Sequence, residues 1–175
     1  MTTIEPVLRI SGLTKHYGGV KALTDAQFRL LPGEHAAMEF LKQAKLPADA
    51  EVLDFGCGTG RGALMIALFG AAKVHMLDFT DNCLDSEVKQ ATETQPGRIR
   101  FSVADLTREI PHQAQYGYCT DVMEHIPSKK VRDVLRGIRE RSRKGAFFNI
   151  ATREDAFGLL IGKKLHMTVL AAPVW

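Results

Sequence analysis

Residues 52–60 read Val-Leu-Asp-Phe-Gly-Cys-Gly-Thr-Gly, a short apolar run followed by three glycines at alternate positions. The apolar residues predict a buried strand. The glycines predict a tight turn, because they adopt backbone conformations that residues with a Cβ rarely reach, and they let a ligand approach the backbone closely. A helix is expected over residues 60–69, and the N–H groups at its start favour a negatively charged ligand group. This stretch therefore predicts a strand, a ligand-binding turn and a helix.

From residue 51 onward, short apolar strands alternate with helices. Strands are predicted over residues 51–55, 73–77, 99–103, 116–121 and 146–151. Helices are predicted over residues 60–69, from an N-cap at Thr80 with Leu84, Val88 and Ala91 inward, and from Pro127 to a stop at Lys144-Gly145. This alternation predicts an α/β fold with a parallel sheet covered on both faces. In such sheets the ligand lies beyond the carboxyl ends of the strands.

The first 34 residues have a different pattern. Residues 7–17 and 22–31 are extended in character, and Gly18-Gly19 between them is a turn signal. These residues predict a β-hairpin, and a helix opens after it at Pro32-Gly33. We therefore expect two parts, a hairpin segment over residues 1–34 and a second domain over residues 35–175.

The composition is that of an ordinary globular protein, with 45% hydrophobic and 25% charged residues. A net charge of +3 is too small to indicate a nucleic-acid partner. The three cysteines, at positions 57, 83 and 119, have no CxxC spacing, so we expect no disulfide framework and no metal site. The N-terminus lacks the pattern of a signal peptide, and the apolar stretch over residues 63–72 is too short to span a membrane. We expect a cytoplasmic protein without a membrane partner.

Acidic residues follow the second and third predicted strands. Asp78 ends the second strand, where a carboxylate can accept hydrogen bonds from both ribose hydroxyls of an adenosine. Asp105 follows the third strand and could accept a hydrogen bond from an adenine amino group. Each also has a plainer interpretation, since Asp78 could be an acid before the helix N-cap at Thr80 and Asp105 an exposed cap.

The glycine turn alone does not identify the cofactor. Gly58, Gly60 and Ala63 also satisfy the dinucleotide pattern GxGxxA. Asp54, two residues before the first glycine, would repel an incoming pyrophosphate. This charge and Asp105 favour an adenosyl cofactor without a pyrophosphate over a nicotinamide dinucleotide.

Four motifs in order resemble those of the class I S-adenosylmethionine (SAM) methyltransferases, over residues 51 to about 151. LDFGCGTG at residues 53–60 is similar to the family's first motif, and MLDFT at 76–80 resembles the acidic second. VADL at 103–106 resembles the third, which contacts adenine, and YCTDVMEHIP at 118–127 resembles the fourth. Within it, VMEHIP is similar to the branch that includes quinone and small-molecule methyltransferases.

The resemblance implies a Rossmann-like sheet of order 3-2-1-4-5, SAM as cofactor and a small-molecule methyl acceptor. It places the methionine carboxylate at the glycine turn, the ribose at Asp78, the adenine at Asp105 and Leu106, and Asp121 on the cofactor side. The implied cofactor-binding residues are Asp54, Gly56, Cys57, Gly58, Gly60, Asp78, Phe79, Asp105, Leu106 and Asp121. No catalytic residue is assigned.

Two further features have alternative interpretations. His125 could act as a general base, because an imidazole titrates near neutral pH, or it could simply order the loop before a helix. We favour the structural role. The basic run over residues 129–144 could bind an acidic substrate, but we favour a solvated helix face.

Both ends of the chain depart from the methyltransferase pattern. Residues 7–34 resemble the opening of the ATP-binding subunits of ABC sugar importers, in which the position of Tyr17 stacks on adenine. No GxxxxGK[ST] phosphate loop follows, so we do not expect ATPase activity. Residues 147–169 resemble the segment after the fifth strand in some bacterial and phage-type methyltransferases.

After that segment the antiparallel hairpin that normally finishes the sheet is expected to be missing. The acceptor half would then be incomplete, and the N-terminal hairpin or a partner subunit would cover the exposed edge. The alternatives to a methyltransferase are a non-catalytic SAM-fold protein, an ABC-type ATP-binding fragment and a nicotinamide oxidoreductase.

Overall fold

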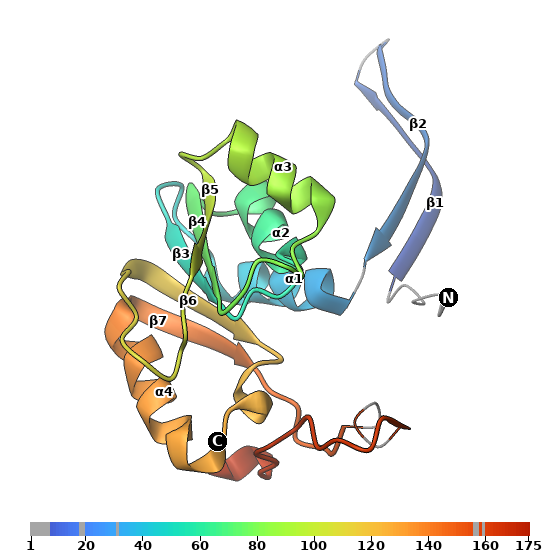
Figure 1. The fold of residues 1–175 in the computed structure, drawn as a ribbon. Coiled ribbons are helices and arrows are strands. Elements are labelled where there is room, and N and C mark those ends of the chain that lie inside the picture. The colour runs from blue at the N-terminus through green and yellow to red at the C-terminus, as the bar shows by residue number, and fades with distance from the viewer. Residues whose placement is uncertain (1–7, 18–19, 31, 156–157, 159) are drawn as a thin grey trace.

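A computed structural model of the chain describes residues 8–17, 20–30, 32–155, 158 and 160–175. Its centre is a five-stranded sheet in the order β5-β4-β3-β6-β7, with all four neighbouring pairs parallel (Figure 1). The strands are β3 (Glu51–Phe55), β4 (Lys73–Asp78), β5 (Ile99–Val103), β6 (Ala114–Thr120) and β7 (Ser142–Asn149). Counted along the chain, this is the order 3-2-1-4-5, so the predicted fold is confirmed.

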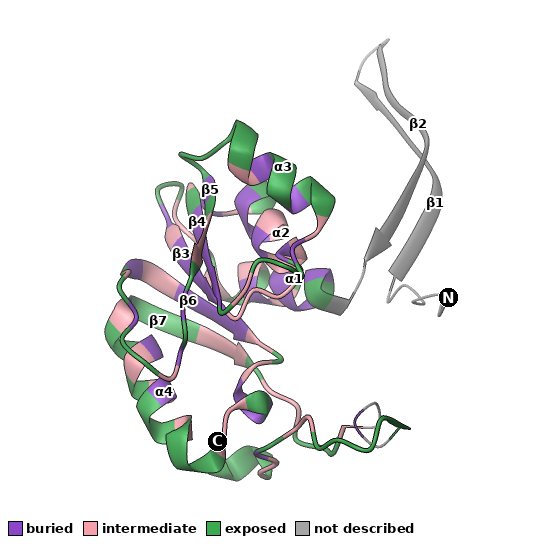
Figure 2. Cartoon of the chain, viewed as in Figure 1, coloured by how far each residue is buried: buried purple, intermediate pink, exposed green. Residues whose placement is uncertain are grey.

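Helices cover both faces of this sheet. The helices are α1 (Pro32–Ala44), α2 (Arg61–Phe69), α3 (Ser86–Thr94) and α4 (Ser128–Arg141), with short 3-10 turns η1 (Met123–His125) and η2 (Ala172–Val174). Two separate apolar clusters result, one containing Phe40, Ile66 and Val88 from α1, α2 and α3, and the other containing Val134 and Ile138 from α4. The buried residues lie in the strands and on the inward helix faces (Figure 2).

The strands supply both clusters because successive side chains of a strand point to opposite faces. In β3, Val52 packs into the cluster with α1–α3, whereas Leu53 and Phe55 pack into the cluster with α4. In β4, Met76 and Leu77 divide in the same way. The central strands are therefore buried on both sides, as continuous apolar runs in parallel sheets predict.

The N-terminal hairpin is present as a separate two-stranded sheet. β1 (Leu8–Tyr17) pairs antiparallel with β2 (Val20–Leu30), in a register that sets Leu8 opposite Leu30. The expected turn at Gly18-Gly19 lies outside the described residues. Because β1 and β2 pair with each other and not with β7, the expectation that this hairpin would cover the sheet edge is wrong.

Two predicted helix boundaries also need correction. The helix after β4 begins at Ser86, and its N-cap is Asp85, whose Oδ1 accepts a hydrogen bond from the Glu87 N–H at 3.2 Å. Thr80 is therefore not the cap. The helix after the fourth motif ends at Arg141, not at Lys144-Gly145, and β7 begins at once with Ser142. Among the described residues no helix is long and apolar enough to cross a membrane.

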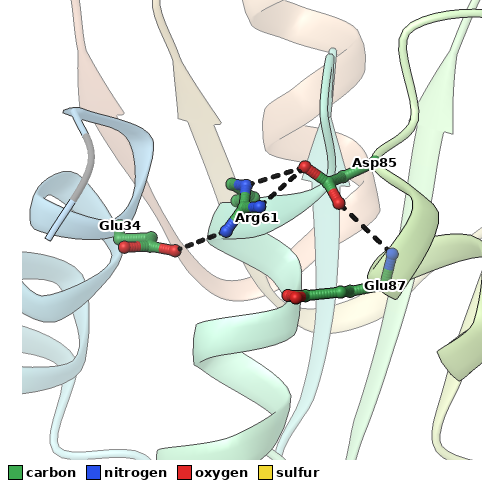
Figure 3. A network of polar contacts seen from close by, with 4 residues as sticks. All are labelled: Glu34, Arg61, Asp85 and Glu87. Carbon is green, nitrogen blue, oxygen red and sulfur yellow. Dashed lines mark hydrogen bonds and ion pairs between the residues drawn. The ribbon is translucent and has the colours of Figure 1, made fainter. Parts of the chain in front are cut away.

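A charged network joins the starts of three helices beside the glycine turn (Figure 3). Arg61, the first residue of α2, donates from Nε to Oδ2 of Asp85 at 2.9 Å and from Nη1 to Oε1 of Glu34 at 3.2 Å. Its Nη2 lies 2.8 Å from the same Asp85 oxygen. The Arg61 side chain is 27% exposed, so the ion pairs are partly shielded from water. The network therefore links α1, α2 and the N-cap of α3.

We predict that Arg61→Gln lowers the free energy of unfolding by about 1–2 kcal/mol, because hydrogen bonds between charged and partly buried groups are stronger than exposed ion pairs. Chemical denaturation measures this change. Arg132→Gln on the exposed face of α4 is the control. Equal effects of the two substitutions would contradict a role for the network.

Candidate cofactor cleft

A cleft of about 550 Å³ lies beyond the carboxyl ends of the parallel strands. Seven of the ten predicted cofactor-binding residues line it: Gly56, Gly58, Asp78, Phe79, Asp105, Leu106 and Asp121. They come from the ends of four different strands and the segments that follow, so residues far apart in the chain meet in one place. The volume is within the range of small-molecule and cofactor sites.

The glycine turn has the conformation that its sequence predicts. Gly56, Gly58 and Gly60 have φ values of 74°, 53° and 74°, in the left-handed region that favours glycine. The N–H groups of Gly56 and Cys57 donate to the Leu77 carbonyl at 2.7 and 3.1 Å, which fixes the turn across the end of β4. A Cβ on Gly58 would project into open space, whereas one on Gly60 would run into Val88. Gly58 therefore faces the cleft and Gly60 faces the core.

Asp78 is buried at the end of β4, beneath this turn. Its Oδ2 accepts the Gly58 N–H at 2.8 Å and its Oδ1 accepts the Phe79 N–H at 2.7 Å. The Gly58 N–H is thus already used within the protein. A carboxylate has about four lone-pair positions, so Asp78 keeps the capacity to accept hydrogen bonds from a ligand.

Asp105 lies at the edge of the cleft and interacts with residues that follow it closely in the chain. Its Oδ1 accepts from the Thr107 N–H at 2.9 Å and from the Thr107 hydroxyl at 2.7 Å, and its Oδ2 lies 3.3 Å from Arg108. The two hydrogen bonds from Thr107 lower the pKa of the Asp105 carboxyl. The carboxylate therefore caps its own turn, and the predicted adenine contact stays a prediction.

Three predicted residues, Asp54, Cys57 and Gly60, are not among those that line the cleft. Cys57 packs against the core, and burial raises the pKa of its thiol well above the usual range. Asp54 is 3% exposed, and its burial together with the nearby Asp78 carboxylate raises its pKa to about 8. Both effects favour the neutral acid, and Asp54 does not line the cleft, so the structure gives no support to the expectation that its charge repels a pyrophosphate.

The loop after β6 forms the opposite wall of the cleft. Asp121 has φ 54°, and its N–H donates to the Asn149 carbonyl at 2.9 Å. Partial burial and the Glu124 carboxylate raise the pKa of Asp121, whereas His125 and His166 lower it. Val122 contacts the turn, because a Cβ on Gly56 would lie 2.5 Å from its Cγ2. The fourth motif therefore packs directly on the first.

The C-terminal segment returns to this loop and adds a residue to the lining of the cleft. The Thr168 N–H donates to the Glu124 carbonyl at 3.0 Å, and the Thr168 hydroxyl donates to the Ile126 carbonyl at 2.7 Å. Met167 consequently lines the cleft, together with His125. Met167 could not be predicted as a cleft residue, because it lies in an irregular segment with no motif or periodicity to mark it.

A family model described as methyltransferase domain matches residues 52–145, just over half of the chain. This chain belongs to that methyltransferase family. The cofactor of the family is SAM, and the prediction of SAM is confirmed at that level. The match begins after residues 7–34, so their resemblance to ABC subunits stays a prediction.

Two methyltransferase relatives are named for different substrates. The chain is 29% identical over 136 residues to ribosomal protein L11 methyltransferase of Shewanella denitrificans, covering 74% of this chain and 44% of that protein. It is 34% identical over 79 residues to ubiquinone biosynthesis O-methyltransferase of Neisseria meningitidis serogroup C, covering 43% of this chain and 33% of that protein. The chain therefore spans less than half the length of these curated relatives.

The methyltransferase fold also matches solved structures. Magnesium protoporphyrin IX methyltransferase from Synechocystis PCC 6803, crystallised with bound SAH, superposes with a TM-score of 0.53 at 19% identity. The superposition covers 74% of this chain and 57% of that one. At this identity the likeness shows the shared fold.

We predict that Asp54→Asn reduces the pH dependence of stability. The native Asp54 carboxyl keeps its proton up to about pH 8, whereas in the unfolded chain it releases the proton near its ordinary value of 3.8. The native state then binds more protons between these values, so this residue makes the free energy of unfolding fall as the pH rises from about 4 to about 8.

Denaturation of the native protein and of Asp54→Asn at pH 5 and pH 8 tests this prediction. The amide resembles the protonated carboxyl, so the variant is expected to lose less stability at pH 8 than the native protein does. The exposed Asp81→Asn is the control. If Asp54→Asn and the native protein showed the same pH dependence, the assignment of a raised pKa would be wrong.

Proposed function

We propose that this chain binds SAM in the cleft at the carboxyl ends of β3, β4, β5 and β6 and transfers its methyl group to a small-molecule acceptor. The observation that carries the proposal is the convergence of the predicted motifs on one cleft. Gly58 and Asp78 lie on one wall, and Asp105 and Asp121 belong to the other lining segments. The sulfonium of SAM would leave as a neutral thioether, so alignment of the reacting atoms supplies much of the rate.

The protein groups fit an adenosyl ligand. Gly58 has no side chain and open space beside it, so a ligand can approach the backbone closely there. Asp78 is the acceptor for ribose hydroxyls. Leu106 and the exposed Phe79 provide apolar surface for the adenine ring. The N-terminus of α2 favours the carboxylate of the methionine part.

The acceptor would enter beside the fourth motif. The lining there is mostly apolar, from Val122, Ile126, Pro127 and Met167, with Asp121 and His125 as the polar groups. An apolar surface with two convergent polar side chains suits a small acceptor with a ring or chain and one reacting heteroatom. The Nδ1–H of His125 donates to the Leu165 carbonyl at 3.0 Å, which supports the positional role favoured above.

We predict that the folded chain binds SAM and that Gly58→Arg abolishes binding, because the new side chain would occupy the cleft. Asp78→Asn is expected to weaken binding roughly ten- to a hundredfold through the loss of hydrogen bonds to a charged acceptor. Isothermal titration calorimetry with SAM measures both effects, and NAD and ATP are the competing ligands to titrate.

Gly97→Arg is the matched control, because a Cβ at Gly97 also meets open space but lies far from the cleft in a turn before β5. It should bind SAM as the native chain does. No binding of SAM by the folded native chain, or equal binding by Gly58→Arg, would refute the proposal. Binding of SAM without methyl transfer to any small acceptor would favour the non-catalytic alternative.

A further inference from the structure

Three side chains with metal-binding chemistry gather at the acceptor end of the cleft. One candidate ligand atom from each of Glu124, His125 and His166 lies within 4.8 Å of the other two. Glu124 and His125 belong to η1, and His166 belongs to the C-terminal segment that follows β7 and returns to η1. The two imidazole rings meet edge to face, with centroids 5.1 Å apart. We propose that these residues form a binding site for a divalent transition-metal ion.

The Glu124 carboxylate lacks a complete set of partners without an ion. The residue is 1% exposed. Its Oε1 accepts the Ala151 N–H at 3.1 Å, but Oε2 is buried and has no hydrogen-bond partner among the residues that the structure describes. An unpaired buried carboxylate oxygen is costly, so its presence calls for a compensating charge or donor. A bound cation supplies that compensation.

Backbone carbonyls bind Nδ1 of both histidines, which leaves Nε2 of each ring as the atom that can bind a metal. His125 Nδ1 lies 3.0 Å from the Leu165 carbonyl oxygen, and His166 Nδ1 lies 2.8 Å from the Arg153 carbonyl oxygen. A carbonyl only accepts, so each Nδ1 must carry the proton and donate it. Each Nε2 is then left with a free lone pair. The same arrangement, a ligand histidine donating its other N–H to a carbonyl, is typical of metal sites.

The donor set indicates the class of metal. Two imidazole nitrogens and one carboxylate suit zinc, iron, manganese or cobalt, whereas magnesium and calcium prefer oxygen donors alone. Three protein ligands leave coordination positions open, as in catalytic metal sites. Asp121 lies close enough for all three side chains to influence its pKa, and it adds negative charge on the cleft side.

The open positions would face the acceptor, because His125 and Asp121 both line the cleft. A metal there could bind a hydroxyl oxygen of the acceptor and favour its deprotonated form. This consequence rests on the proposed methyl transfer, whereas the metal site itself does not.

Titration of the full chain, prepared metal-free and without a histidine tag, tests the site. Co²⁺ is the probe, because its visible absorption changes when nitrogen and carboxylate ligands bind, and Zn²⁺ is then added in competition. We expect one Co²⁺ per chain, displaced by Zn²⁺. His166→Ala, His125→Ala and Glu124→Gln should each weaken binding by at least about tenfold. His35→Ala, at an exposed histidine of α1, is the control and should bind as the native chain does.

Glu124→Gln keeps an oxygen that can accept the Ala151 N–H, and His166→Ala changes a residue outside the sheet and helices. Both variants are therefore expected to fold, and circular dichroism checks this. Absence of Co²⁺ binding would overturn the proposal, as would equal binding by the native chain and the three ligand variants. Gly58→Arg separates the two proposals, because it should abolish SAM binding while leaving Co²⁺ binding unchanged.

Discussion

The turn between β3 and α2 is the constraint on which the cleft depends. Gly56, Gly58 and Gly60 are all in the left-handed region, so the chain reverses over the end of β4 with little steric strain. Hydrogen bonds from the turn to the Leu77 carbonyl and to the Asp78 carboxylate then lock it onto the neighbouring strand. Because Gly56 also leaves no room for a Cβ against Val122, the same turn sets how closely the fourth motif can approach.

Buried acidic groups lie beneath this turn, and their environments give them different roles. Asp78 accepts hydrogen bonds from two backbone N–H groups. Asp54 is buried beside it, and its raised pKa favours the protonated form. Two negative charges in one low-dielectric place would repel each other, so holding one as a neutral acid reduces the repulsion. Of these two buried carboxyl groups, only Asp78 lines the cleft.

The far wall of the cleft depends on contacts between segments that are far apart in the chain. Thr168 binds the carbonyls of Glu124 and Ile126, and the Ala151 N–H reaches the Glu124 carboxylate. These bonds position Met167 on the cleft and bring His166 to His125. The part of the cleft proposed for the adenosyl group is therefore built by strand ends and a glycine turn, and the part proposed for the acceptor by an irregular segment held through side chains. That difference fits a fold with a common cofactor part and a variable acceptor part.

The sequence by itself predicted the five parallel strands and the glycine turn, because apolar periodicity and glycine conformation are local properties. The order of the strands was implied by the resemblance of the motifs to those of the class I SAM methyltransferases, and the structure has that order. Asp78, Asp105 and Asp121 could be predicted as cleft residues, because each lies at or just after the carboxyl end of a predicted strand. Tertiary structure alone decided that Asp85 and not Thr80 caps α3, that Asp54 and Gly60 do not line the cleft, and that the hairpin does not pair with β7. It also decided the meeting of His166 with Glu124, since side-chain proximity across an irregular segment leaves no periodic signal in the chain.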